Sequence, residues 1–236
     1  KWCAKKESDS EKVTMEDYNV ETCKIDEEVG ETGGATLVPP TGEDTHKGIV
    51  YLDPTYLQKE CNESNSVSDT GTKEGCMKWY IYDDSGDTYK LLLDHNTTAK
   101  VAWNSDGENN EMKEIKTKLG KDVATWLPQL NARLITADEI ASITKNQQFD
   151  SAIAETSDEF FFDTNTDDYD PDRGPGTSKY AWLFDRTYDC TEYGCDEADD
   201  LNYGYWTSTA IYDSSSNVWV VSYKGHISNS NASTDD

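Results

Sequence analysis

The sequence predicts an α+β fold in which two helices pack against small antiparallel sheets and long loops join the elements. Three observations lead to this prediction. Two pairs of short apolar segments flank polar turns, a pattern typical of β-hairpins. Two segments between these pairs carry helix-capping signals. The strands and helices do not alternate regularly, which favours α+β over a parallel α/β sheet.

The first 47 residues have no hydrophobic period, and residues 28–45 are rich in Gly, Pro, Thr and acidic residues. We interpret residues 1–47 as an N-terminal stalk or linker, with a small loop closed by Cys3 and Cys23. The character of the sequence changes at Gly48, where the predicted domain of residues 48–236 begins. Its first strand, residues 49–52, ends at Pro54, which lacks the N–H needed for a sheet ladder.

The first hairpin joins residues 77–82 to residues 88–93 through a polar turn in which Gly86 can adopt a positive φ. Residues 180–184 form an apolar run that we predict to be a buried strand. The second hairpin joins residues 206–211 to residues 218–223. Both faces of its second strand carry apolar residues, so we expect this strand to be buried on both sides.

Two helices are predicted between the hairpins. Asn110 is the expected cap of the first, which ends at Gly120 and places three apolar residues on one face, Met112, Ile115 and Leu119. Glu114 and Lys118 are spaced for an i,i+4 ion pair. In the second helix, Thr136 and Glu139 form a capping box.

The chain has 47 acidic against 21 basic residues, for a formal net charge of −26. Such a surface repels nucleic acids and anionic membranes but attracts cations and basic proteins. No apolar run approaches the roughly 20 residues needed to cross a bilayer, so we expect no transmembrane segment. The acidity has a simpler alternative explanation, because charge also keeps an exported protein in solution.

Six cysteines without a Cys-x-x-Cys pair indicate disulfides, and therefore an extracellular or cell-surface location. Sequence alone allows many pairings. Sequential neighbours flank polar loops, and this favours three local bridges: Cys3–Cys23, Cys61–Cys76 and Cys190–Cys195.

Two motifs carry a family resemblance. Residues 133–139, Arg-Leu-Ile-Thr-Ala-Asp-Glu, resemble the Arg-Leu-Pro-Thr-x-x-Glu signature that opens a helix in bacterial C-type-lectin-like proteins of the formylglycine-generating-enzyme branch. Residues 205–209, Tyr-Trp-Thr-Ser-Thr, with the later Val-Trp-Val and Tyr-Lys-Gly, resemble their late strands. That branch includes secreted paralogues and retroelement-diversified proteins. The resemblance covers residues 48–236 and departs from the signature at Ile135, where relatives have proline.

The resemblance implies a C-type-lectin-like fold with small antiparallel sheets, two helices and long loops. It also implies a final strand beside the first strand of the domain, which we do not find in the sequence after residue 230. Either the final strand lies beyond residue 236, or an open sheet edge remains at residues 49–52 that another chain could fill.

An enzymatic alternative depends on Cys190 and Cys195, which have the spacing of the cysteine pair of formylglycine-generating enzymes. In that family the pair follows the late tryptophan strand, whereas here it precedes Trp206 and has acidic neighbours that disfavour a thiolate. We therefore predict a non-catalytic protein. The three histidines form no recognisable catalytic constellation and are expected at the surface: His46, His95 and His226.

An acidic segment offers oxygen ligands at alternating positions, as in the opening of a calcium-binding loop. The candidate ligands for Ca²⁺ are Asp163, Asn165, Asp167, Asp170 and Asp172. The segment is not a full EF-hand, because Asp168 replaces the glycine and Gly174 replaces the final glutamate. A solvated acidic loop is the alternative.

The last hairpin carries the Tyr, Ser and Asn mixture that is typical of adaptable binding surfaces. The candidate ligand-binding residues are Tyr212, Ser214, Ser216, Asn217, Tyr223, His226 and Asn229. We predict an exported bacterial surface protein, adhesive or ligand-binding, that recognises an extracellular protein or glycan. The alternative is a pilin-like or filament subunit that assembles with copies of itself.

Overall fold

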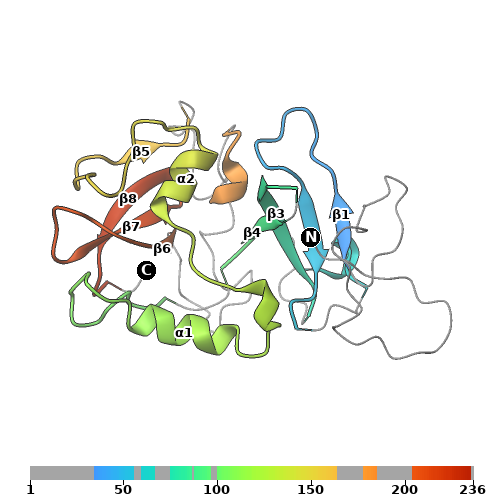
Figure 1. Ribbon diagram of the computed structural model, residues 1–236, viewed down its shortest axis with the longest axis horizontal. Coiled ribbons are helices and arrows are strands. Elements are labelled where there is room, and N and C mark those ends of the chain that lie inside the picture. Colours follow the sequence, from blue (N-terminus) through green and yellow to red (C-terminus); the bar gives the residue numbers. More distant parts are fainter. Residues whose placement is uncertain are drawn as a thin grey trace.

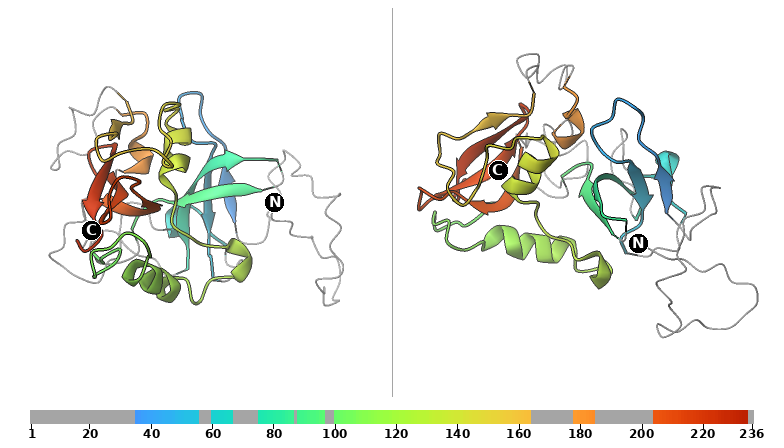
Figure 2. Two further views of the ribbon diagram at one scale, coloured as in Figure 1. Left: turned by 60° about the vertical axis from the view of Figure 1, so that its left-hand side comes forward. Right: turned by 45° about the horizontal axis from the view of Figure 1, so that its top comes forward.

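The computed structural model describes residues 35–55, 60–66, 75–86, 88–96, 100–163, 178–184 and 204–234. It confirms the α+β prediction, since these residues form two helices and two small antiparallel sheets. The two sheets lie on opposite sides of the molecule, and helix α1 lies below the second sheet in the view of Figure 1. Two further views show helix α2 beside the second sheet (Figure 2).

The first sheet has the order β1-β2-β3-β4, and its strands are β1 (Thr36–Val38), β2 (Ile49–Leu52), β3 (Met77–Asp84) and β4 (Tyr89–Leu93). The hairpin β3–β4 is the first predicted hairpin, and Gly86 in its turn has a φ of 83°. The expectation of an open edge at β2 is wrong, because β1 pairs with β2 on the side away from β3. Strand β1 comes from the region interpreted as a stalk, and the division at residue 47 stays a prediction.

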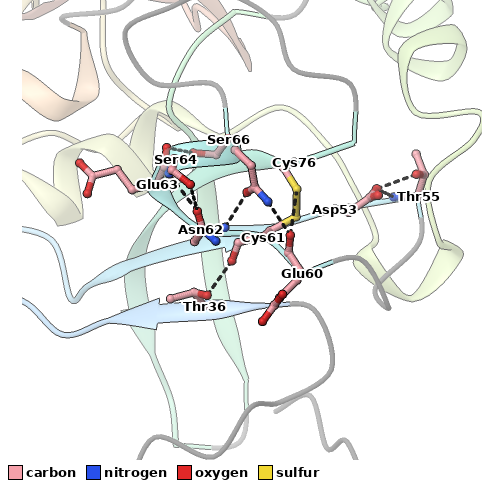
Figure 3. Close-up of a disulfide and its surroundings, with 11 residues drawn as sticks. Thr36, Asp53, Thr55, Glu60, Cys61, Asn62, Glu63, Ser64, Ser66 and Cys76 are labelled. Atoms are coloured by element: carbon pink, nitrogen blue, oxygen red, sulfur yellow. Dashed lines mark hydrogen bonds between the residues drawn. A yellow bond between two sulfur atoms is a disulfide. The ribbon is translucent and has the colours of Figure 1, made fainter.

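The bridge between Cys61 and Cys76 is confirmed and fastens the loop that joins β2 to β3 (Figure 3). Both cysteines are buried against Tyr51. The Thr36 hydroxyl donates to the carbonyl of Cys61 at 2.6 Å, which ties β1 to the same loop. The cysteines of the other two predicted bridges lie outside the described residues, so those pairings stay predictions.

The second sheet has the order β5-β8-β7-β6, and its strands are β5 (Phe160–Phe161), β6 (Gly204–Ala210), β7 (Asn217–Ser222) and β8 (His226–Asn231). Strands β6 and β7 form the second predicted hairpin. Strand β7 is central and is buried on both faces as expected, with Trp219 in one hydrophobic cluster and Val218 in another. Strand β8 was not predicted, because only Ile227 in it is a large apolar residue.

Helix α2 (Ala137–Ile143) has the predicted capping box, in which Thr136 and Glu139 exchange hydrogen bonds. Helix α1 (Glu114–Asp122) differs from the prediction. It begins after Asn110, whose side chain donates to Glu108, and it continues through Gly120.

The expected ion pair between Glu114 and Lys118 in α1 is replaced by other contacts. The Glu114 carboxylate accepts hydrogen bonds from the backbone and hydroxyl of Ser105, at 2.8 and 2.7 Å. Lys118 instead pairs with Asp122 at 3.2 Å, one turn further along the helix.

Residues 180–184 are buried as predicted, but the expected strand is wrong. The segment forms a 3₁₀ turn, η6 (Ala181–Leu183), within the main hydrophobic cluster. A second 3₁₀ turn, η4 (Pro128–Leu130), follows α1, and a third, η3 (Glu63–Asn65), follows Cys61. No helix in the described part of the chain is long and apolar enough to cross a membrane.

Candidate functional site

The turn between β6 and β7 presents Tyr212, whose side chain is 71% exposed. Asn109, in the segment before α1, hydrogen-bonds to the backbone of this turn. Its side-chain amide donates to the carbonyls of Ser214 and Asn217 at 2.9 and 2.7 Å, and its backbone N–H donates to Ser215. Asn109 is itself buried. The exposed tyrosine therefore stands on a turn with a fixed backbone.

The predicted serine and asparagine residues of the turn are engaged in the turn itself. The Ser214 hydroxyl accepts hydrogen bonds from the backbone N–H groups of Ser216 and Asn217, at 3.1 and 2.9 Å. The Asn217 side chain donates to Asn229 on β8 at 3.2 Å. These side chains stabilise the turn and β8 and are half-buried. Tyr212 is the most accessible member of the predicted set.

A second loop packs beside this turn and fixes β8. Glu159 accepts hydrogen bonds from the Asn229 amide at 2.6 Å and from the Ser228 hydroxyl at 2.9 Å. Thr156 donates through its backbone N–H to the Asp213 carboxylate at 3.1 Å. The loop, the turn and β8 therefore form one connected polar surface.

At the β5 edge, the His226 ring packs at a tilt against Phe161, with ring centroids 4.9 Å apart. Burial lowers the pKa of His226, although the nearby Glu159 carboxylate acts in the opposite direction. The Lys224 ammonium lies 5.5 Å from the Tyr223 ring centroid in a cation–π contact. The predicted ligand residues are thus brought together on one sheet, but at two places: the β6–β7 turn and the β7–β8 turn.

The predicted metal ligands are only partly described. The Asp163 carboxylate accepts hydrogen bonds from the Ser178 hydroxyl at 2.8 Å and from the Lys179 backbone at 3.1 Å. The other four candidate ligands, residues 165, 167, 170 and 172, lie outside the described residues. Within the described ranges, no group of three or more His, Cys, Asp or Glu side chains is placed to hold a metal ion. The Ca²⁺ site stays a prediction.

The expectation that all histidines lie at the surface is wrong. His46 is 8% exposed and packs between Tyr80 and Trp182, and its Nδ1 accepts a hydrogen bond from the Gly48 backbone. His95 is also buried. Burial lowers the pKa of His46, as expected for an imidazole that serves as an aromatic core residue.

A cavity of about 680 Å³ separates the two sheets. Strand β4, an edge of the first sheet, forms one wall, and residues 204–206 of β6, an edge of the second sheet, form the opposite wall. Helix α1 and the following segment to residue 135 close it on a third side. Sequence reasoning missed this cavity, because its walls come from segments that are more than 100 residues apart.

Glu139 links the first sheet to α2 at the rim of the cavity. Its carboxylate accepts two hydrogen bonds from Arg133, at 2.6 and 2.8 Å, and one from the Tyr82 hydroxyl at 3.1 Å. Burial alone would raise the pKa of Glu139, but these donors and the Thr136 backbone outweigh it and lower the pKa to about 2. Burial and the Glu139 charge raise the pKa of Tyr82 to about 12.

No family model matches the sequence, and neither the curated proteins nor the solved structures that were compared with it gave a match.

Proposed function

We propose that this chain is an exported bacterial surface protein with a non-catalytic, C-type-lectin-like domain that binds an extracellular protein or glycan. The observation that supports this proposal best is the exposure of Tyr212 on a turn with a fixed backbone. An aromatic ring with few rotatable bonds on a rigid support offers a large contact area at low entropic cost.

The surroundings of Tyr212 favour a protein ligand with a basic surface. The turn carries Asp213, the adjacent loop carries Glu155 and Glu159, and the whole chain has a net charge of −26. A partner of opposite charge associates faster, and salt reduces this acceleration because it screens the attraction. A basic protein surface therefore fits this face better than an acidic glycan does.

A binding screen with matched variants tests the proposal. The protein is probed against a glycan array and a panel of acidic, neutral and basic proteins, and any ligand found is titrated against the Tyr212→Ala variant. We expect loss of a central aromatic contact to weaken binding by about tenfold or more. The Leu37→Ala variant, changed at an exposed position on the first sheet, should bind normally. Equal loss in both variants, or no loss in Tyr212→Ala, would contradict the proposed face.

One observation favours the filament alternative. Strand β1 is an edge strand, and its Leu37 and Val38 are 42% and 40% exposed. Edge strands with exposed apolar residues pair readily with other chains. If self-assembly is the function, mass in solution will rise with concentration, and Leu37→Lys will abolish this rise while Tyr212→Ala will not. The two variants therefore distinguish the two functions.

A further inference from the structure

We propose that the β5 edge of the second sheet carries a subsite for an arginine side chain, formed by the Phe161 ring and the Glu159 carboxylate. This inference rests on the proposed surface function and deepens it, since it names the group through which a basic partner binds this part of the face. The subsite lies at β5, whereas Tyr212 lies on the β6–β7 turn, so the two places can be tested separately.

Phe161 is the exposed member of three consecutive phenylalanines. Phe160 and Phe162 pack within the main hydrophobic cluster, whereas Phe161 lies on the other face of the strand and is 59% exposed. Its ring packs at a tilt against His226, with ring centroids 4.9 Å apart. This contact supports the ring while most of its surface stays open to a partner.

The Glu159 carboxylate is held in one orientation beside this ring. Its Oε1 accepts three hydrogen bonds: from the Asn229 side-chain amide at 2.6 Å, from the Ser228 hydroxyl at 2.9 Å and from the Asn229 backbone N–H at 3.1 Å. Its Oε2 accepts none from the described residues. The donors on one oxygen orient the carboxylate and leave the other oxygen as a preorganised acceptor for a charged donor.

Both groups lie on the same face of the sheet. Glu159 and Phe161 are two residues apart in extended chain, so their side chains point to one side at positions roughly 7 Å apart. Their contacts agree with this placement, because Ser228 and His226, which they touch, are also two residues apart on β8. An arginine side chain can contact both groups, since its planar guanidinium packs on an aromatic ring while its N–H groups bond to a carboxylate.

The charge at this edge favours a cation. Residues 150–163 contain five acidic residues and no lysine or arginine. No lysine or arginine of the described residues forms an ion pair with Glu159. Burial and the Lys224 charge lower the pKa of His226 against the opposite effect of Glu159, so the imidazole is uncharged at about pH 7. The Lys224 ammonium itself lies 5.5 Å from the Tyr223 ring centroid.

The test is an NMR titration of the isotope-labelled full chain with three capped tripeptides that differ only in the middle residue: acetyl-Gly-Arg-Gly-amide and its citrulline and lysine equivalents. Citrulline keeps the planar shape of the arginine side chain but carries no charge. We expect saturable shifts of the amides of residues 159–161 and 226–229 with the arginine peptide. The other two peptides should bind about two- to fivefold more weakly.

Three variants assign the binding to the two groups. Glu159→Gln keeps an acceptor oxygen for Ser228 and Asn229 but removes the charge, so the arginine and citrulline peptides should now bind alike. Phe161→Leu keeps an apolar side chain without an aromatic face and should weaken arginine binding about two- to fivefold. Glu43→Gln removes the same charge at an exposed position outside the second sheet and should leave the affinity unchanged.

The comparison between peptides separates a direct contact from a structural role. If Glu159 only stabilised β8, Glu159→Gln would weaken the arginine and citrulline peptides equally, and this result would overturn the proposal. Equal binding of all three peptides to the wild type, shifts confined to residues away from β5 and β8, or unchanged arginine affinity in Phe161→Leu would also overturn it. Because the titration uses no natural partner, such a failure refutes the subsite and leaves the Tyr212 test of the proposed face unaffected.

Discussion

Replacing Glu139 by glutamine tests how the first sheet is attached to the rest of the molecule. The carboxylate accepts hydrogen bonds from three sources, namely Arg133, the Tyr82 hydroxyl and the Thr136 backbone. Tyr82 belongs to β3, whereas Thr136 begins α2. A glutamine side chain has one acceptor oxygen instead of two and carries no charge, so most of these donors lose their partner.

The magnitude follows from the pKa of the carboxyl. Folding lowers the pKa of Glu139 from 4.5 to about 2, and its side chain is only 17% exposed, so solvent screens the interaction weakly. This difference corresponds to about 3 kcal/mol of folding free energy. Because the folded pKa is the lower one, the contribution is complete above the unfolded value of 4.5 and is lost as the pH falls towards 2.

Urea unfolding of the wild type and of Glu139→Gln measures this contribution. At about pH 7 the variant should be less stable by about 2–3 kcal/mol, and the gap should shrink steadily below about pH 4. Glu43→Gln, at an exposed position, is the matched control and should change stability little at any pH. A gap that stays constant down to about pH 2 would refute the assignment of the pKa shift to this cluster.

Replacing both Cys61 and Cys76 by serine should cost about 3 kcal/mol in urea unfolding, since the bridge closes a loop with a sequence separation of 15. Asn109→Ala should lower stability by about 1–3 kcal/mol and speed hydrogen exchange in the β6–β7 turn, which loses its side-chain donor. Burial lowers the pKa of His226 below 6.5, so its contribution to stability is full above that value and is lost as the pH falls. An NMR titration should therefore show His226 protonating below the ordinary histidine pKa, and a normal or raised value would contradict this.

Sequence predicts best the elements that are determined by residues close together in the chain. The capping box at Thr136 and Glu139 depends on residues three positions apart, and the β3–β4 turn depends on Gly86. Residues 180–184 show the opposite case. Their apolar character correctly indicates burial, but a short apolar run fits a 3₁₀ turn as well as a strand, and packing within the main core decided between them.

The start of α1 was misplaced for a similar reason. Asn110 is a good cap by residue type, but Lys113 donates its backbone N–H to the carbonyl of Trp103, and the helix begins at the next residue. Trp103 is a buried residue whose indole N–H reaches the carbonyl of Thr207 on β6. The position of the helix is therefore set by a contact with a strand about 100 residues later, which local signals do not contain.

The candidate face was only partly predictable. A mixture of Tyr, Ser and Asn after a hairpin strand identified Tyr212, which is exposed. The same composition did not distinguish a residue that faces solvent from one that braces a turn, as Ser214 and Asn217 do. Asn109, which fixes the turn, lies about 100 residues earlier, and asparagine is so common in this chain that its spacing gives no signal.

The three consecutive leucines of β4 show how an edge strand can be apolar on both faces. A strand that is apolar on both faces normally lies inside a sheet, yet β4 is an edge. An apolar edge is a site of unwanted pairing unless something covers it. Here α1 and the segment after it line the same cavity as β4. Leu92 packs against the main hydrophobic cluster and Leu91 packs against the cluster formed by β2 and β3, so both faces of β4 contact apolar residues, in a chain with a mean hydropathy of −0.83.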